Sequence, residues 1–152
     1  MYSKYTYLVC LFLFFGLSSI AQGNFNGLWK GTITQNDGGY KSNYDFELYL
    51  HQDGKTVYGR SYVFDGELYA EMELKGEVYN DNYLRFQETK IVDHTIGENM
   101  EWCIKRGQLL LSYKKNDAYI SGLWKGKTSF SDCIPGRIEL KKEILRASID
   151  NY

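Results

Sequence analysis

Apolar and polar side chains alternate with a period of two along most of the chain after residue 43. In residues 44–51, one face carries Tyr44, Phe46, Leu48 and Leu50. In residues 68–79, one face carries Leu68, Ala70, Met72, Leu74, Gly76 and Val78. Because successive side chains of a strand point to opposite faces, this pattern predicts β-strands with one buried face.

Short segments rich in Gly, Asn, Asp and Pro separate these strands. Tight turns are predicted at Asp53-Gly54, Asn80–Asn82, Arg106-Gly107 and Ile134–Arg137. A turn at Asp53-Gly54 places Leu50 opposite Val57. The last strands are expected at Asp117–Phe130 and Gly136–Lys142.

The turn predicted at Arg106-Gly107 sets the faces of the strand around it. It places Ile104 opposite Leu109 and Trp102 opposite Leu111, which leaves Cys103 on the outer face.

About eight or nine strands joined mostly by tight turns indicate an all-β fold, an antiparallel up-and-down meander. We expect it to form a closed or nearly closed barrel, and a two-sheet sandwich is the alternative.

The first 21 residues have the composition of a secretory signal peptide. Lys4 precedes an apolar run over residues 8–17, and the small residues Ser19 and Ala21 precede a cleavage point before Gln22. The run is too short for a membrane span, although an uncleaved anchor is the alternative. We therefore expect residues 22–152 to form a single exported β-barrel domain, periplasmic or extracellular, with no integral membrane span.

Composition and charge narrow the partners. Aromatic residues make up 16% of the chain. The formal net charge is -1, and this charge gives no electrostatic reason to expect nucleic-acid binding. Cys103 and Cys133 are the cysteines that remain after removal of the signal peptide. In an oxidising compartment a disulfide between them is expected, and two reduced structural cysteines are the alternative.

The pentapeptide Gly-Leu-Trp-Lys-Gly occurs twice, at residues 27–31 and 122–126. Two copies 95 residues apart do not make a repeat array. We interpret them as two strands, each with a Trp in the core, and assign structural roles to Trp29, Trp124 and Trp102.

At Gly27-Leu28-Trp29 the chain resembles the lipocalins and the wider calycin group, whose first barrel strand carries a Gly-x-Trp motif. The chain also looks like small secreted bacterial proteins without an assigned activity. The lipocalin resemblance implies a ligand-binding barrel closed at one end by the Trp, with an Arg of the last strand stacked on it. Arg137 is the candidate for that Arg, and the lipocalin Thr-Asp-Tyr-like loop motif is missing.

The sequence contains no nucleophile elbow, phosphate loop or zinc motif, and no catalytic residue, metal or cofactor is assigned. His94, with Asp93, Glu98 and Glu101 in a predicted loop over residues 93–99, forms an acidic patch without metal-specific spacing. Alternation places Glu88 on the inner face or at the mouth, where a solvated rim residue is the favoured interpretation. Paired with a second carboxylate, it would allow a glycan-directed enzyme.

Binding is better supported than catalysis. Tyr58, Arg60, Tyr62 and Phe64 form an alternating outer stripe that could contact sugars or an apolar peptide. Cross-strand pairing within the sheet explains the stripe equally well. Our hypothesis is a non-catalytic exported lipocalin-like domain that binds a small apolar ligand or an envelope partner, with Glu88 and this stripe as ligand-binding residues. A glycan-directed envelope enzyme and a purely structural or protein-interaction domain are the alternatives.

Overall fold

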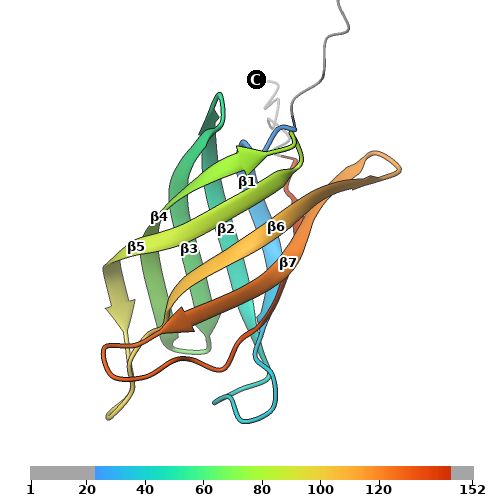
Figure 1. Cartoon of the computed structure of the whole chain (residues 1–152). Coiled ribbons are helices and arrows are strands. Elements are labelled where there is room, and N and C mark those ends of the chain that lie inside the picture. Colours follow the sequence, from blue (N-terminus) through green and yellow to red (C-terminus); the bar gives the residue numbers. More distant parts are fainter. Residues whose placement is uncertain (1–22, 145–152) are drawn as a thin grey trace, which may run out of the picture.

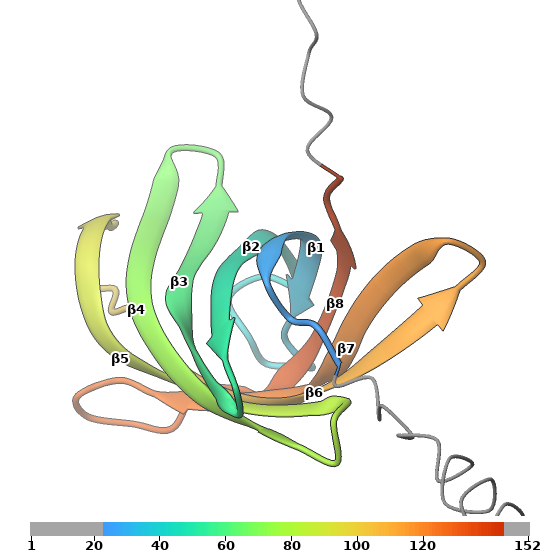
Figure 2. The ribbon, with the colours of Figure 1, turned by 90° about the horizontal axis from the view of Figure 1, so that it is seen from above.

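The computed structural model describes residues 23–144, which form eight β-strands and no helix. The strands are β1 (Gly27–Thr34), β2 (Asn43–Asp53), β3 (Thr56–Asp65), β4 (Leu68–Tyr79), β5 (Tyr83–Thr95), β6 (Ile104–Lys114), β7 (Asp117–Lys127) and β8 (Gly136–Lys142). Each strand pairs antiparallel with the next, and β1 pairs with β8 (Figures 1 and 2). The closed barrel confirms the predicted meander, and the sandwich alternative is wrong. The predicted signal peptide lies outside the described residues.

The predicted inner faces of β2 and β4 are confirmed. The apolar sets of β2 and β4 point into the core, where Phe46, Leu48, Ala70 and Met72 have no exposed surface. The β2–β3 turn lies at Gly54-Lys55, one residue later than predicted, so that Leu50 is opposite Gly59 and not Val57. A register shift of two residues keeps every side chain on its face, which is why the error in the turn did not change the core.

The turn predicted at Arg106-Gly107 is wrong. Both residues lie within β6, and Ile104 is opposite Lys127 on β7. Gly107 serves close packing, because a Cβ atom there would lie 2.7 Å from Cε1 of Phe86. The hairpin turns instead at Lys115-Asn116, where Lys115 has a φ of 57°.

The strand predicted at Gly136–Lys142 is confirmed as β8, and the turn predicted at Ile134–Arg137 is wrong only in its last two residues, Gly136 and Arg137, which are strand residues. A side chain at Gly136 would collide with the carbonyl oxygen of Thr34. The preceding strand ends at Lys127 and not at Phe130.

The two ends of the barrel differ. At the upper end in Figure 1, turns of two or three residues join β2 to β3, β4 to β5 and β6 to β7. At the lower end, residues 35–42, 96–103 and 128–135 form loops of eight residues each, beside the short β3–β4 turn. We call the upper end, with the short turns, the closed end, and the lower end, with the three loops of eight residues, the open end.

Phe25 and Trp29 fill the closed end, and neither has exposed surface. The indole N–H of Trp29 donates to the carbonyl oxygen of Phe25 at 2.8 Å. The ammonium of Lys142, on the last strand, lies 5.3 Å from the centre of the Trp29 ring, and burial lowers its pKa. Arg137 is not the stacking partner, because it pairs with Glu139 at 2.8 Å. A cation of β8 thus covers the Trp, but it is a lysine.

The second copy of the pentapeptide lies in β7. Trp124 is 4% exposed and its indole N–H donates to the carbonyl oxygen of Thr34 at 2.8 Å. The prediction that both repeated Trp residues are core residues of strands is confirmed.

Candidate functional site

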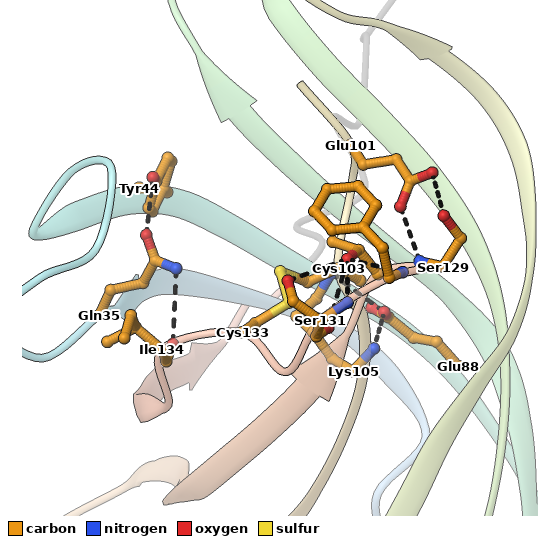
Figure 3. The surroundings of a disulfide bond; sticks show 12 residues. Gln35, Tyr44, Glu88, Glu101, Cys103, Lys105, Ser129, Ser131, Cys133 and Ile134 are labelled. Carbon is orange, nitrogen blue, oxygen red and sulfur yellow. Dashed lines mark hydrogen bonds and ion pairs between the residues drawn. A yellow bond between two sulfur atoms is a disulfide. The ribbon is translucent and has the colours of Figure 1, made fainter. Parts of the chain in front are cut away.

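Two of the loops at the open end are joined to each other twice. Cys103 and Cys133 form a disulfide with a Cα–Cα distance of 6.3 Å, which confirms the predicted pairing (Figure 3). The carboxylate of Glu101 accepts hydrogen bonds from the amide and the hydroxyl of Ser129, both at 2.7 Å. These bonds hold the pKa of Glu101 below its ordinary value of 4.5. Loops 96–103 and 128–135 are therefore held in one arrangement.

The side chain of Gln35 connects the third loop to this pair. Its amide oxygen accepts a hydrogen bond from the hydroxyl of Tyr44 at 2.9 Å, and its amide nitrogen donates to the carbonyl oxygen of Ile134 at 3.4 Å (Figure 3). The amide of Asn36 donates to the carbonyl oxygen of Pro135 at 2.9 Å. All three long loops are thus fixed around the mouth of the barrel.

A cavity of about 170 Å³ opens between these loops and the barrel interior. Its walls are formed by Ile33, Gln35, Tyr40, Tyr44, Val63, Leu68, Ile96, Met100, Glu101, Trp102, Cys103, Lys105 and Trp124. Most of these side chains are apolar or aromatic. The indole N–H of Trp102 donates to the carbonyl oxygen of Thr95 at 3.0 Å, which orients the ring at the mouth.

Lys105 reaches this cavity from a buried polar cluster. Its ammonium lies 3.0 Å from Oε2 of Glu88, and its backbone N–H donates to the same oxygen at 2.7 Å. The hydroxyl of Ser61 donates to the other carboxylate oxygen at 2.5 Å. The relative exposure of the side chains is 4% for Lys105 and 0% for Glu88. Burying two charges is costly, and the mutual pairing and hydrogen bonds offset that cost.

The remaining contacts of the Lys105 ammonium are weak. It donates to the carbonyl oxygen of Cys103 at 3.3 Å, approaches Sδ of Met72 at 3.5 Å, and lies 5.8 Å from the centre of the Phe46 ring. The ammonium therefore has one strong partner, and weaker acceptors occupy its other directions.

The interpretation of Glu88 as a solvated rim residue is wrong. β5 continues to Thr95, so Glu88 lies within the strand and inside the barrel. Both carboxylate oxygens are occupied, and the side chain has no surface with which to meet a polysaccharide. Sequence reasoning missed Lys105. Continuing the inward set Leu111, Leu109 and Gly107 by two more residues would have found it, had no turn been placed at residues 106–107.

The outer stripe lies on β3 with its groups engaged by neighbours. The guanidinium of Arg60 lies 3.5 Å from Glu71 and 3.2 Å from Glu73. The rings of Tyr62 and Phe64 are 6.5 Å apart and stacked, and the rings of Tyr58 and His51 are 4.8 Å apart. Burial raises the pKa of Tyr62. The contacts of Arg60 and Tyr58 are those of cross-strand pairing, whereas Tyr62 and Phe64 are neighbours on one face of β3. A ligand-binding role for the stripe stays a prediction.

The acidic patch around His94 is not a loop cluster. Asp93 and His94 belong to β5, and Glu101 bonds to Ser129. In the part of the chain that the structure describes, no group of three or more His, Cys, Asp or Glu side chains could hold a metal ion.

An eight-stranded antiparallel barrel with one closed end and a cavity at the other is consistent with a lipocalin-like fold. The chain matches no protein-family model, and searches of curated proteins and of solved structures likewise return no match. Residues 23–144 contain no helix that is long and apolar enough to cross a membrane.

Proposed function

We propose that this protein is an exported, non-catalytic binding domain, lipocalin-like in architecture, that takes a small apolar ligand through the open end of its barrel. The observation that carries the proposal is the apolar cavity inside the open end, enclosed by loops that a disulfide and hydrogen bonds fix in place. Sites for small molecules are typically concave, mostly apolar and formed before the ligand arrives.

The size of the cavity limits the ligand. A cavity of roughly 150 Å³ with apolar walls holds benzene, whereas sites for drug-sized ligands measure roughly 300–1,000 Å³. At about 170 Å³, this cavity fits a single aromatic ring or a short branched aliphatic chain. The Lys105 ammonium at the wall would meet a polar end of such a ligand.

The position of Glu88 favours binding over catalysis. A general acid must reach the proton acceptor of a substrate, and the Glu88 carboxylate already accepts hydrogen bonds from Ser61 and Lys105 inside the barrel. Its place in a binding domain is to hold the Lys105 side chain at the cavity wall.

The binding test is a calorimetric titration of the protein with p-cresol, benzyl alcohol and isoamyl alcohol. For ligands of this size we expect a Kd of about 1 mM or tighter for at least one compound. Leu68→Phe fills the cavity and should abolish the binding. Leu110→Phe makes the same change on the exposed outer face of β6 and should leave it intact.

Native mass spectrometry of the protein from its own host extends the test to the natural ligand. We expect a copurified small molecule that is absent from the Leu68→Phe variant. We also expect the protein to have the mass of a chain that begins at Gln22. The absence of binding to the whole panel, together with a ligand-free protein of that mass, would contradict the proposal and leave the envelope-partner or structural alternative.

A further inference from the structure

A second hollow lies on the outside of the barrel, over β4 to β7, and it differs chemically from the cavity inside. It is an open groove of about 910 Å³. Its exposed polar side chains include Lys75, Glu77, Arg85, Gln87, Arg106, Gln108 and Lys125. In Figure 1 the strands β5, β6 and β7 cross in front of the rest of the barrel.

The strand register arranges the cations of this groove in a row. Lys75 is opposite Gln87, Gln87 is opposite Arg106, and Arg106 is opposite Lys125. Neighbouring strands lie about 4.8 Å apart, so the row crosses four strands within roughly 14 Å. We call Lys75, Gln87, Arg106 and Lys125 the cationic row.

Carboxylates do not neutralise this row, although they neutralise cations elsewhere on the barrel. Lys30 is opposite Glu47 and pairs with it at 3.0 Å. In residues 23–144, by contrast, the three cations of the cationic row form no ion pair. The carboxylate of Glu77, beside the row, accepts a hydrogen bond from the hydroxyl of Tyr79 at 2.6 Å.

The direct opposition of Arg106 and Lys125 is unfavourable for folding. Like charges in a directly opposed cross-strand pair destabilise a sheet, and the formal net charge of the whole chain is -1. A basic row on a slightly acidic protein is therefore a local feature that the barrel does not need for its stability.

We propose that this groove binds an acidic glycan, a polysaccharide that carries carboxylate, sulfate or phosphate groups. Cations along the row would meet the anionic groups. The amide of Gln87 within the row, and that of Gln108 beside it, can bond to sugar hydroxyls. Leu123, 67% exposed at the edge of the groove, offers an apolar contact to the face of a sugar ring.

The aromatic side chains of the groove distinguish this occupant from a nucleic acid. Binding of single-stranded nucleic acid relies on bases stacked on open aromatic faces. Here Trp124 is buried, and the guanidinium of Arg85 lies 5.1 Å from the centre of the Tyr79 ring. Trp124 is therefore not available for stacking, and the Arg85 guanidinium lies over the ring of Tyr79, which is 38% exposed.

The test measures binding of the full protein to heparin, a sulfated glycan, and to alginate, a carboxylated one, at about 50 mM salt, where surface charges are only partly screened. Dextran is the neutral control and a single-stranded oligonucleotide is the other class of polyanion. The test variant combines Arg106→Gln with Lys125→Gln. The matched control combines Lys30→Gln with Lys141→Gln, which removes two cations that have carboxylate partners.

We expect at least one acidic glycan to bind, dextran not to bind, and the groove variant to weaken binding by about tenfold or more. The control variant should change it by less than about twofold, since its cations lie outside the groove. The groove variant should melt no lower than the original protein, because it removes a like-charge pair. Failure of both glycans to bind, an equal loss in both variants, or groove-dependent binding of the oligonucleotide alone would overturn the proposal.

Discussion

At the closed end of the barrel, short turns join the strands, and Phe25 and Trp29 fill the interior. At the open end, three loops of eight residues surround a cavity of about 170 Å³ and are held by a disulfide and side-chain hydrogen bonds. Stability at the first end therefore comes from apolar packing. The second end also buries Trp124, but half-buried side chains such as Tyr44 and Trp102 line its mouth. There, covalent and polar contacts hold the loops around the cavity. A packed scaffold that positions loops around a site is a common arrangement in binding proteins.

The largest difference between the ends is expected from the removal of one Trp at each. Trp29→Ala leaves a cavity in the closed end and should lower the free energy of unfolding by about 4 kcal/mol. Trp102→Ala, at the mouth, should lower it by about 1 kcal/mol, because the half-buried ring loses less contact. Urea denaturation measures both values, and equal losses would contradict the assignment of a packed and an open end.

Removal of the disulfide should lower the free energy of unfolding almost as much. It should also loosen the loops at the open end in particular. Its cysteines are separated by 30 residues, and replacing both with Ser should cost about 3.5 kcal/mol in the loop-entropy description. Hydrogen exchange should increase in loops 96–103 and 128–135 and stay unchanged in the turn at residues 80–82. An increase that is equal at both ends would contradict a particular role of the disulfide in holding the loops at the mouth.

The buried ion pair between Glu88 and Lys105 lies inside the barrel, and breaking it should have the third-largest effect on the free energy of unfolding. Lys105→Met leaves the Glu88 carboxylate inside the barrel without its cation and should cost about 3 kcal/mol. Adding Glu88→Met removes the unpaired charge, and the double variant should recover to within about 1 kcal/mol of the original protein. Denaturation of both single variants and the double variant forms a double-mutant cycle, and strict additivity would rule out the coupling.

The smallest effect is a pH response confined to the open end. The folded pKa of Glu101 lies below its ordinary value of 4.5 because the amide and hydroxyl of Ser129 donate to the ionised carboxylate. This contribution is present above pH 4.5 and is lost as the pH falls through the lower folded pKa. The NMR signal of the Ser129 amide should follow that titration below pH 4.5. In Glu101→Gln the signal should not move, and a movement that persists would assign it to another group.

The site was harder to predict than the fold, and residues 104–107 show why. Arg106-Gly107 has the composition of a turn, yet Gly107 is needed because the Phe86 ring of the neighbouring strand occupies the space of a side chain. Sequence offers no means of separating these two uses of glycine. With a turn placed at residues 106–107, the inward position of Lys105 was missed. Glu88 was interpreted as a solvated rim residue because its strand was expected to end near it, whereas β5 continues to Thr95.

The sequence by itself determined which side chains face inward on most strands, because the period of two is a local property of the backbone and survives the two-residue shift at Gly54-Lys55. It also determined that Cys103 and Cys133 were available to pair. Only the tertiary structure decided that β1 meets β8, that Glu88 meets Lys105, and that the apolar space lies at one end. These contacts join residues distant along the chain, and barrel closure and packing fix their register, which no local pattern encodes.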